Sequence, residues 1–201
     1  PDLGDNGVAG MGARAGSSFV ICVTGSESTG KTTLATALAK RLGAPLVAEV
    51  ARDWLATRTH RAEGGELNDA YGPEDVLAIA RAQEEAENAV LATHAPLVIA
   101  DTDQTVISVW WQVRYGGLHP FIAAALGRRS PRAYLLLEPD IPWQPDPLRE
   151  HASGREGLHA RYQALLRDDD FPFEEISGFG DERLQRAVDA VALWQERGRL
   201  G

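Results

Sequence analysis

The segment Gly25-Ser-Glu-Ser-Thr-Gly-Lys-Thr32 restricts this chain to few folds, because it matches the G-x-x-x-x-G-K-[ST] pattern of a phosphate-binding loop. It directly follows an apolar run, Phe19–Thr24, and opens a helical pattern over residues 30–42. Between a strand and a helix, backbone N–H groups and the helix N-terminus can surround phosphate oxygens. Of the 20 basic residues only Lys31 and Lys40 are lysines, so a chance match has a probability on the order of 0.2%.

The loop predicts ATP and Mg²⁺ as cofactors. Lys31 would neutralise the β- and γ-phosphates, and the Thr32 hydroxyl would ligate Mg²⁺. Thr33 could bond to the α-phosphate. The predicted nucleotide-binding residues are Gly25, Ser26, Glu27, Ser28, Thr29, Gly30, Lys31, Thr32 and Thr33.

Strand and helix patterns alternate along the chain, which predicts an α/β fold. We expect the three-layer α/β/α sandwich of a P-loop NTPase with a mostly parallel five-stranded sheet. The predicted strands are Phe19–Thr24, Pro45–Ala48, Pro96–Asp101, Ala133–Glu138 and Pro172–Ser177. The predicted helices cover residues 30–42, 50–59, 73–93, 103–115, 119–128, 158–168 and 181–197. Residues 1–17 are expected to form a disordered leader, and residues 18–201 a single domain.

Composition excludes several classes of function. The 29 acidic residues exceed the 20 basic ones, giving a net charge of −9, which argues against a general nucleic-acid binder. No apolar run reaches the length of a membrane span, and the Gly-rich first 17 residues lack the apolar core of a signal peptide. The single cysteine, Cys22, excludes a disulfide within the chain and a Cys-rich zinc site. We therefore expect a cytoplasmic protein without membrane partners.

Three acidic residues follow predicted strands, where open α/β sheets bind their ligands. Asp101 ends the third strand, at the place of the acid that holds Mg²⁺, with capping of the next helix as the alternative. Asp103 could share the metal, hold a substrate hydroxyl or cap the same helix. Glu49 follows the second strand, where it could accept the proton of an attacking hydroxyl or be a surface acid at a helix start.

A candidate lid covers residues 139–157, which are rich in Pro, Asp, Arg and Gly. Arg149 and Arg155 could close over ATP and stabilise the transferring phosphoryl group. The alternative is a Pro-rich surface loop with solvated arginines.

Aromatic residues cluster after the strand ends. Taken one by one, each is more simply a packing residue than a ligand contact. Trp110 and Trp111 are adjacent, so only one of them should face a pocket. The candidates for substrate contact are Trp54, Trp110, Tyr115 and Trp143.

Five segments occur in a fixed order: GSESTGKTTL (25–34), AEVARDW (48–54), VIADTDQT (98–105), EPDIPWQPDPLR (138–149) and FGDERLQR (179–186). Together they resemble the ribosylnicotinamide (nicotinamide riboside) kinase domain of bacterial bifunctional NAD-salvage proteins. The resemblance covers about residues 19–197 and implies ATP-dependent phosphorylation of the ribose 5′-hydroxyl of nicotinamide riboside. It does not extend to the adenylyltransferase domain of those proteins, whose H-x-G-H motif does not occur in these 201 residues.

The resemblance also implies roles for individual residues. Glu49, Arg52, Asp101 and Asp103 would surround the ribose and the metal. Trp143, Asp146 and Arg149 would belong to the lid, and Ser177–Glu182 would approach the adenine. The segment AEVARDW is also similar to deoxynucleoside kinases, whose glutamate at this place is the general base, and this favours Glu49 over Asp101 as the base.

The sequence is compatible with two other functions. One is a kinase of another nucleoside or small alcohol, and the other is a P-loop regulatory ATPase. The carboxylates of Glu49, Asp101 and Asp103 are expected to make the acceptor side acidic, which would favour a cationic nicotinamide ring.

Overall fold

Five short parallel strands form one sheet in the order β2-β3-β1-β4-β5. They are β1 (Phe19–Gly25), β2 (Leu46–Val47), β3 (Leu97–Asp101), β4 (Arg132–Leu137) and β5 (Phe173–Ile176). This computed structural model describes residues 18–59, 71–142 and 154–198. The predicted sheet is confirmed, and every strand pairing in it is parallel. Strands β1 and β4 are buried along their whole length, as expected for a sheet that is covered on both faces.

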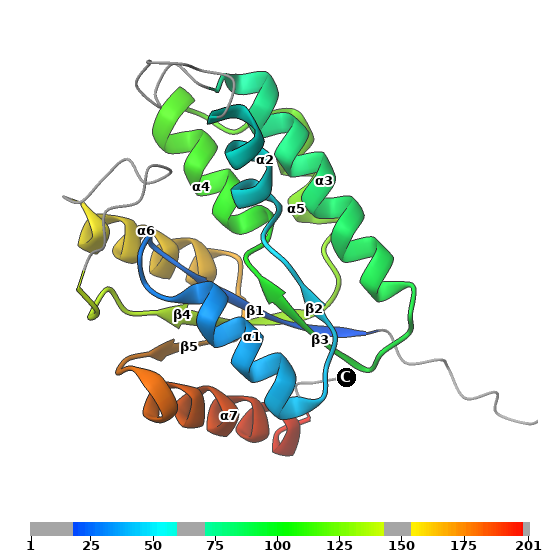
Figure 1. The fold of residues 1–201 in the computed structure, drawn as a ribbon, viewed down its shortest axis with the longest axis vertical. Helices are drawn as coiled ribbons and strands as arrows, with labels where there is room; N and C mark the ends of the chain where they lie inside the picture. The colour runs from blue at the N-terminus through cyan, green and yellow to red at the C-terminus, as the bar shows by residue number, and fades with distance from the viewer. Residues whose placement is uncertain (1–17, 60–70, 143–153, 199–201) are drawn as a thin grey trace, which may run out of the picture.

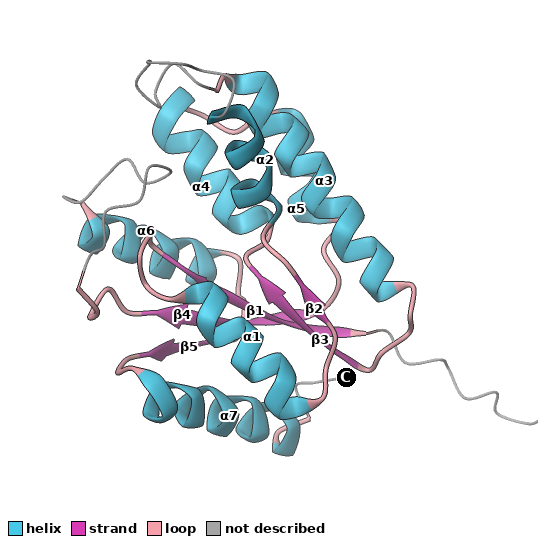
Figure 2. Ribbon diagram, viewed as in Figure 1, coloured by secondary structure: helices cyan, strands magenta, loops and turns pink. Residues whose placement is uncertain are grey.

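Helices cover both faces of the sheet, as Figures 1 and 2 show. The side chains of Phe19, Ile21 and Val23 pack on one face with α1 (Lys31–Leu42) and α7 (Gly180–Glu196). Val20 and Cys22 point to the other face. There they pack with α3 (Pro73–Leu91), α4 (Gln104–Tyr115) and α6 (Arg155–Asp168). Alternation along β1 therefore produces the predicted three layers, and Cys22 is a core residue.

A second group of helices stands beyond one side of the sheet. Helices α2 (Val50–Thr59) and α5 (Pro120–Gly127) pack there against α3 and α4 (Figure 1). Their shared core includes Leu55, Ile79, Ile107 and Ile122. Strand β2 leads into α2 and strand β3 into α4, so this group adjoins the carboxyl ends of these two strands. Within the described residues, no helix is both long enough and apolar enough to cross a membrane.

Strand β1 ends at a position that only glycine can occupy. Gly25 has a φ of 140°, and a Cβ atom there would lie 2.9 Å from the carbonyl oxygen of Leu137 on β4. A side chain would push β1 and β4 apart. The close approach of these two strands thus fixes where the chain leaves the sheet and starts the phosphate-binding loop.

Candidate functional site

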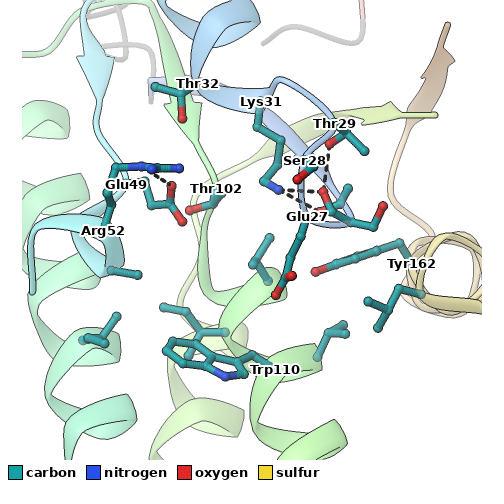
Figure 3. A pocket seen from close by; sticks show the side chains of 18 of the residues that line it. Glu27, Ser28, Thr29, Lys31, Thr32, Glu49, Arg52, Thr102, Trp110 and Tyr162 are labelled. Atoms are coloured by element: carbon teal, nitrogen blue, oxygen red, sulfur yellow. Dashed lines mark hydrogen bonds and ion pairs between the residues drawn. The ribbon is translucent and has the colours of Figure 1, made fainter. Parts of the chain in front are cut away.

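A cavity of about 490 Å³ opens at the carboxyl ends of the strands (Figure 3). All nine residues that the sequence predicted for nucleotide binding, Gly25 to Thr33, line it. Its other walls come from the start of α2 and from α3, α4 and α6. The predicted leader, Trp143, Asp146 and Arg149 lie outside the described residues, and so does most of the predicted lid.

The phosphate-binding loop is closed by its own hydrogen bonds. The Thr29 hydroxyl donates to the carbonyl oxygen of Ser26 at 2.8 Å. Lys31 Nζ donates to the carbonyl oxygens of Gly25 at 3.1 Å and Ser26 at 2.8 Å. Ser28 and Gly30 have positive φ angles of 56° and 81°, which turn successive backbone groups around the loop. With α1 starting at Lys31, the arrangement suits an anion.

Two arginines hold the outer side of this loop. Arg183 on α7, which is 4% exposed, donates from Nη1 to the carbonyl oxygen of Thr29 and pairs with Asp140. Arg155 donates to the carbonyl oxygen of Ile141 at 3.1 Å from both terminal nitrogens. Arg155 does not line the cavity, so in this structure it lies behind the loop and not over the position expected for the transferring phosphoryl group.

Asp101 ends β3 beneath the phosphate-binding loop. Its side chain hydrogen-bonds to that of Thr32, and the residue is only 1% exposed. Burial raises the pKa of Asp101, and the nearby Glu49 carboxylate raises it further, against the effects of Thr32 and Lys31. Its Oδ1 atom has no hydrogen-bond partner among the described residues. A buried carboxylate oxygen without a donor, beside the loop threonine, fits a Mg²⁺ site.

Glu49 lies in the short connection between β2 and α2 and lines the cavity. Its side chain is 23% exposed, and Oε2 lies 3.9 Å from Nε of Arg52, which also lines the cavity. In Figure 3, Glu49 and Thr102 face the space beneath Lys31 from one side, with Tyr162 on the other. The predicted base is thus accessible from the cavity, while Asp101 is covered.

Asp103 does not line the cavity, contrary to the predicted substrate contact. It is 1% exposed and caps α4 by accepting from the backbone N–H of Thr105 at 2.8 Å. It also pairs with Arg132 at 2.9 Å and accepts from the hydroxyl of Tyr134 at 2.7 Å. Thr102 has a left-handed φ of 67° and lines the cavity in its place. The capping alternative is therefore the one observed.

Of the aromatic candidates that the structure describes, only Trp110 lines the cavity. Trp54 and Tyr115 are partly buried against the core of the α2–α5 helices, so their predicted substrate contacts are not observed. Trp111, next to Trp110, is a core residue with 8% exposure. The two tryptophans differ because they lie on different faces of α4: the face with Trp110 turns to the cavity, and the face with Trp111 turns to the core.

Sequence reasoning missed several residues that line the cavity. Trp110 Nε1 donates to the hydroxyl of Tyr71 at 3.2 Å, and Arg114 stacks on the Tyr71 ring at 4.3 Å. Tyr162 on α6 is 4% exposed, and burial raises its pKa, with a smaller contribution from Glu27. The other missed lining residues with polar side chains are Gln83 and Thr102. Thr102 lies inside the segment VIADTDQT, where the two flanking aspartates drew the prediction. The others belong to no recognisable motif, because they reach the site through tertiary packing.

The predicted acidic acceptor side is only partly present. Asp101 and Asp103 are buried and do not line the cavity, whereas Arg52 and Arg114 do. The carboxylates that line it are those of Glu27 and Glu49. Charge around the cavity is therefore mixed, and the remaining wall is mostly aliphatic, with the aromatic side chains of Tyr71, Trp110 and Tyr162.

Comparison with known proteins agrees with this architecture. The sequence model of the AAA domain family matches residues 20–183. The chain belongs to the AAA domain family. Within this AAA domain lie the phosphate-binding loop, Glu49, Asp101 and the pair of arginines behind the loop.

Curated relatives of this AAA domain protein include the trifunctional NAD biosynthesis/regulator proteins NadR of Salmonella typhimurium and Escherichia coli. Each is 27% identical to the chain over 174 residues, which is 85% of this chain and 41% of the relative. The chain thus spans about two fifths of their length. The predicted resemblance to bacterial NAD-salvage proteins is confirmed by these relatives.

Solved structures share the fold. A crystal structure of NadR protein in complex with NR has a TM-score of 0.71 and 23% identity, covering 89% of this chain and 52% of that one. A second, of NadR protein in complex with NAD and AMP-PNP, has the same TM-score and identity and covers 50% of that chain.

Proposed function

We propose that this chain transfers the γ-phosphoryl group of ATP to the ribose 5′-hydroxyl of nicotinamide riboside, giving nicotinamide mononucleotide. One observation carries the proposal: a single cavity joins a complete phosphate-binding loop to an apolar compartment that includes Tyr71, Trp110 and Tyr162, and the partly buried Glu49 lines the same cavity. The sequence relatives are NAD biosynthesis proteins, and a protein of the same fold was crystallised with NR. Because ATP is the donor, we place this reaction in the cytoplasm.

The phosphate side of the cavity supplies positioning and charge neutralisation. Lys31 and the N-terminus of α1 would bind the β- and γ-phosphates. Thr32 and Asp101 would hold Mg²⁺, directly or through water, and the ion would neutralise charge on the phosphate oxygens. The adenine would lie against Ser177–Glu182, where the Phe179 side chain is 69% exposed and its ring could stack on a base.

On the acceptor side, Glu49 would act as the general base. As the 5′-hydroxyl oxygen bonds to the γ-phosphorus, its proton passes to the Glu49 carboxylate, and the bond from that phosphorus to the ADP oxygen breaks. Glu49 is preferred to Asp101 because it faces the cavity, whereas Asp101 is buried against Thr32. Arg52 lies 3.9 Å from Glu49 and lines the same cavity.

The aromatic wall would bind the nicotinamide ring. Trp110 and Tyr162 face the same space in Figure 3, and the Glu27 carboxylate points into it. A flat ring with a positive charge gains from both aromatic faces and a nearby carboxylate. We propose Trp110 and Tyr162 as ring contacts, together with Arg52 at the ribose.

A coupled ADP-release assay with a panel of nucleosides and small alcohols tests this function, and mass spectrometry would identify the product. We expect turnover with nicotinamide riboside and formation of its 5′-monophosphate. Turnover only with another nucleoside or alcohol would replace the acceptor and keep the kinase. ATP hydrolysis without any phosphorylated acceptor would point instead to a regulatory ATPase. Lys31→Ala is the inactive control.

A further inference from the structure

The side chain of Gln83 on α3 holds the backbone on both sides of Glu49. Its Nε2 atom donates to the carbonyl oxygen of Ala48 at 3.2 Å, and its Oε1 atom accepts from the backbone N–H of Val50 at 2.9 Å. Gln83 is 2% exposed. One amide group thus bridges the residue before Glu49 and the residue after it, across more than 30 positions of sequence.

This bridge lies where the backbone lacks its own partners. Strand β2 ends at Val47 and α2 begins at Val50, so the connection that carries Glu49 belongs to neither element. The first N–H groups of a helix have no acceptor within the helix. Gln83 satisfies the first such group of α2 and, with the same amide, the last carbonyl before Glu49. An uncharged amide is the side-chain group that offers both a donor and an acceptor here.

The bridge therefore fixes the backbone position from which the Glu49 side chain extends. Helix α3 packs against both β2 and α2 (Figure 1), so the bridge ties the Glu49 backbone to the wall of the cavity. Within the described part of the chain, the ion pair of Glu49 is with Arg52, at the long distance of 3.9 Å. That contact is too weak to set its orientation, which leaves the backbone as the main determinant.

We infer that Gln83 is a positioning residue for the phosphoryl-transfer step and acts through Glu49. This inference rests on the proposed function, in which Glu49 takes the proton of the acceptor hydroxyl. Displacing a reacting group by about 1 Å can cost about 100-fold in rate. The loss should therefore appear in kcat, while ATP binding at the loop remains.

The alternative is that Gln83, which also lines the cavity, contacts the substrate directly. In that case its replacement would raise KM for the acceptor and leave kcat unchanged. Both bonds of the Gln83 amide in the structure go to the backbone around Glu49, which favours positioning.

The test is a double-mutant cycle with Gln83→Met and Glu49→Gln, measured as single-turnover rates with nicotinamide riboside. Gln83→Met keeps the length of the side chain and removes both bonds. Alone, it should lower kcat about 10-fold to 100-fold with the KM for ATP unchanged. Combined with Glu49→Gln, it should cause almost no further loss, because its effect passes through Glu49. Multiplying losses, or a raised KM at unchanged kcat, would overturn the inference.

Gln104→Met is the matched control. Gln104 is another buried glutamine, 5% exposed, whose Nε2 donates to the carbonyl oxygen of Ala80 at 2.6 Å. It does not line the cavity and has no bond to the backbone around Glu49, so its replacement should leave kcat within about twofold. An equal loss of kcat in this variant would mean that any buried glutamine has the same effect, which overturns the inference.

Two further measurements separate the possible failures. Hydrogen exchange at the Val50 amide should accelerate in Gln83→Met and stay slow in Gln104→Met; unchanged exchange would contradict the bridge itself. If Gln83→Met does not fold, Gln83→Glu retains the acceptor for Val50 and takes the place of Gln83→Met in the cycle.

Wild-type turnover is measured first. Its absence overturns the proposed function and the inference with it, whereas turnover with multiplying losses in the double mutant overturns the inference alone.

Discussion

The guanidinium of Arg132 lies 2.9 Å from the carboxylate of Asp103, and both side chains are almost completely buried. Arg132 also pairs with Glu87 at 2.5 Å. Although burial alone would raise the pKa of Asp103, the Arg132 and Arg129 guanidiniums and the Tyr134 hydroxyl lower it. This pair therefore joins the start of β4 to the first turn of α4. Burying the two charged groups costs free energy, and only the intact pair offsets that cost.

Asp103→Asn should destabilise the fold by about 3 kcal/mol at pH 7, because it leaves Arg132 buried with Glu87 as its remaining acidic partner. The pKa of Asp103 is lowered by folding, so its contribution is present above the unfolded value near pH 3.9 and is lost as the pH falls through the lower folded value. Urea unfolding from pH 7 to pH 3 measures both effects.

The matched control for this prediction is Glu84→Gln, which removes an ion pair with the exposed Arg128. Exposed pairs contribute little to stability, so the free energy of unfolding should change little. If Asp103→Asn also left it unchanged, the buried pair would contribute nothing to folding, contrary to its geometry.

Asp101 should show the opposite stability effect. Burial raises its pKa in the folded state, so the ionised carboxylate becomes a penalty as the pH rises from the unfolded to the folded pKa. Without Mg²⁺, Asp101→Asn should therefore raise the melting temperature at pH 7 by about 1–3 °C. The same change should abolish the stabilisation by Mg²⁺ and ATP, because the metal loses a ligand.

Thermal unfolding with and without Mg²⁺–ATP, together with a Mg²⁺ titration of turnover, measures this prediction. Chelation of the metal should stop turnover in the wild-type protein. A variant with wild-type Mg²⁺ dependence would exclude Asp101 from the metal site and leave it only its hydrogen bond to Thr32.

Much of the fold was predictable because its signals are local. Apolar runs predicted the strands to within about two residues, and Gly25 marked the turn after β1. Helix α6 starts at Arg155, three residues before the predicted start. The reason is tertiary, since Arg155 bonds to the carbonyl oxygen of Ile141, which follows β4. Periodicity within α6 carries no trace of that contact.

The residues of the site also divide into those with a local sequence signal and those placed by tertiary contacts. Lys31 and Thr32 belong to a contiguous motif and were predictable, whereas Asp103 could be judged only once Arg132 was known to lie beside it. Trp54 and Trp110 could not be distinguished in the sequence, since both are aromatic residues that follow a predicted strand. In the structure only Trp110 lines the cavity, because its face of α4 turns toward it. Gln83 carries no sequence signal, because its partners are backbone atoms of a distant connection.

Lys31→Ala should lower turnover strongly while the fold stays intact. The ammonium group bonds to carbonyl oxygens of its own loop, those of Gly25 and Ser26, so its removal should disturb little of the packing between elements. Loss of one preorganised charge should lower kcat by about 100-fold to 1000-fold. Circular dichroism and thermal unfolding check the fold, and Lys40→Ala, near the end of α1, is the control. Retained turnover in Lys31→Ala would exclude the loop as the phosphate site.

Glu49→Gln should lower kcat by about 100-fold to 10,000-fold, the range for loss of a general base. The amide keeps the shape of the side chain but cannot accept the acceptor proton. Binding of a non-hydrolysable ATP analogue, measured by calorimetry, should change little, because Glu49 faces the acceptor side of the cavity. Glu174→Gln on the exposed side of β5 is the control for charge. An unchanged kcat in Glu49→Gln would exclude Glu49 as the base and transfer that role to Asp101, whose side chain hydrogen-bonds to Thr32.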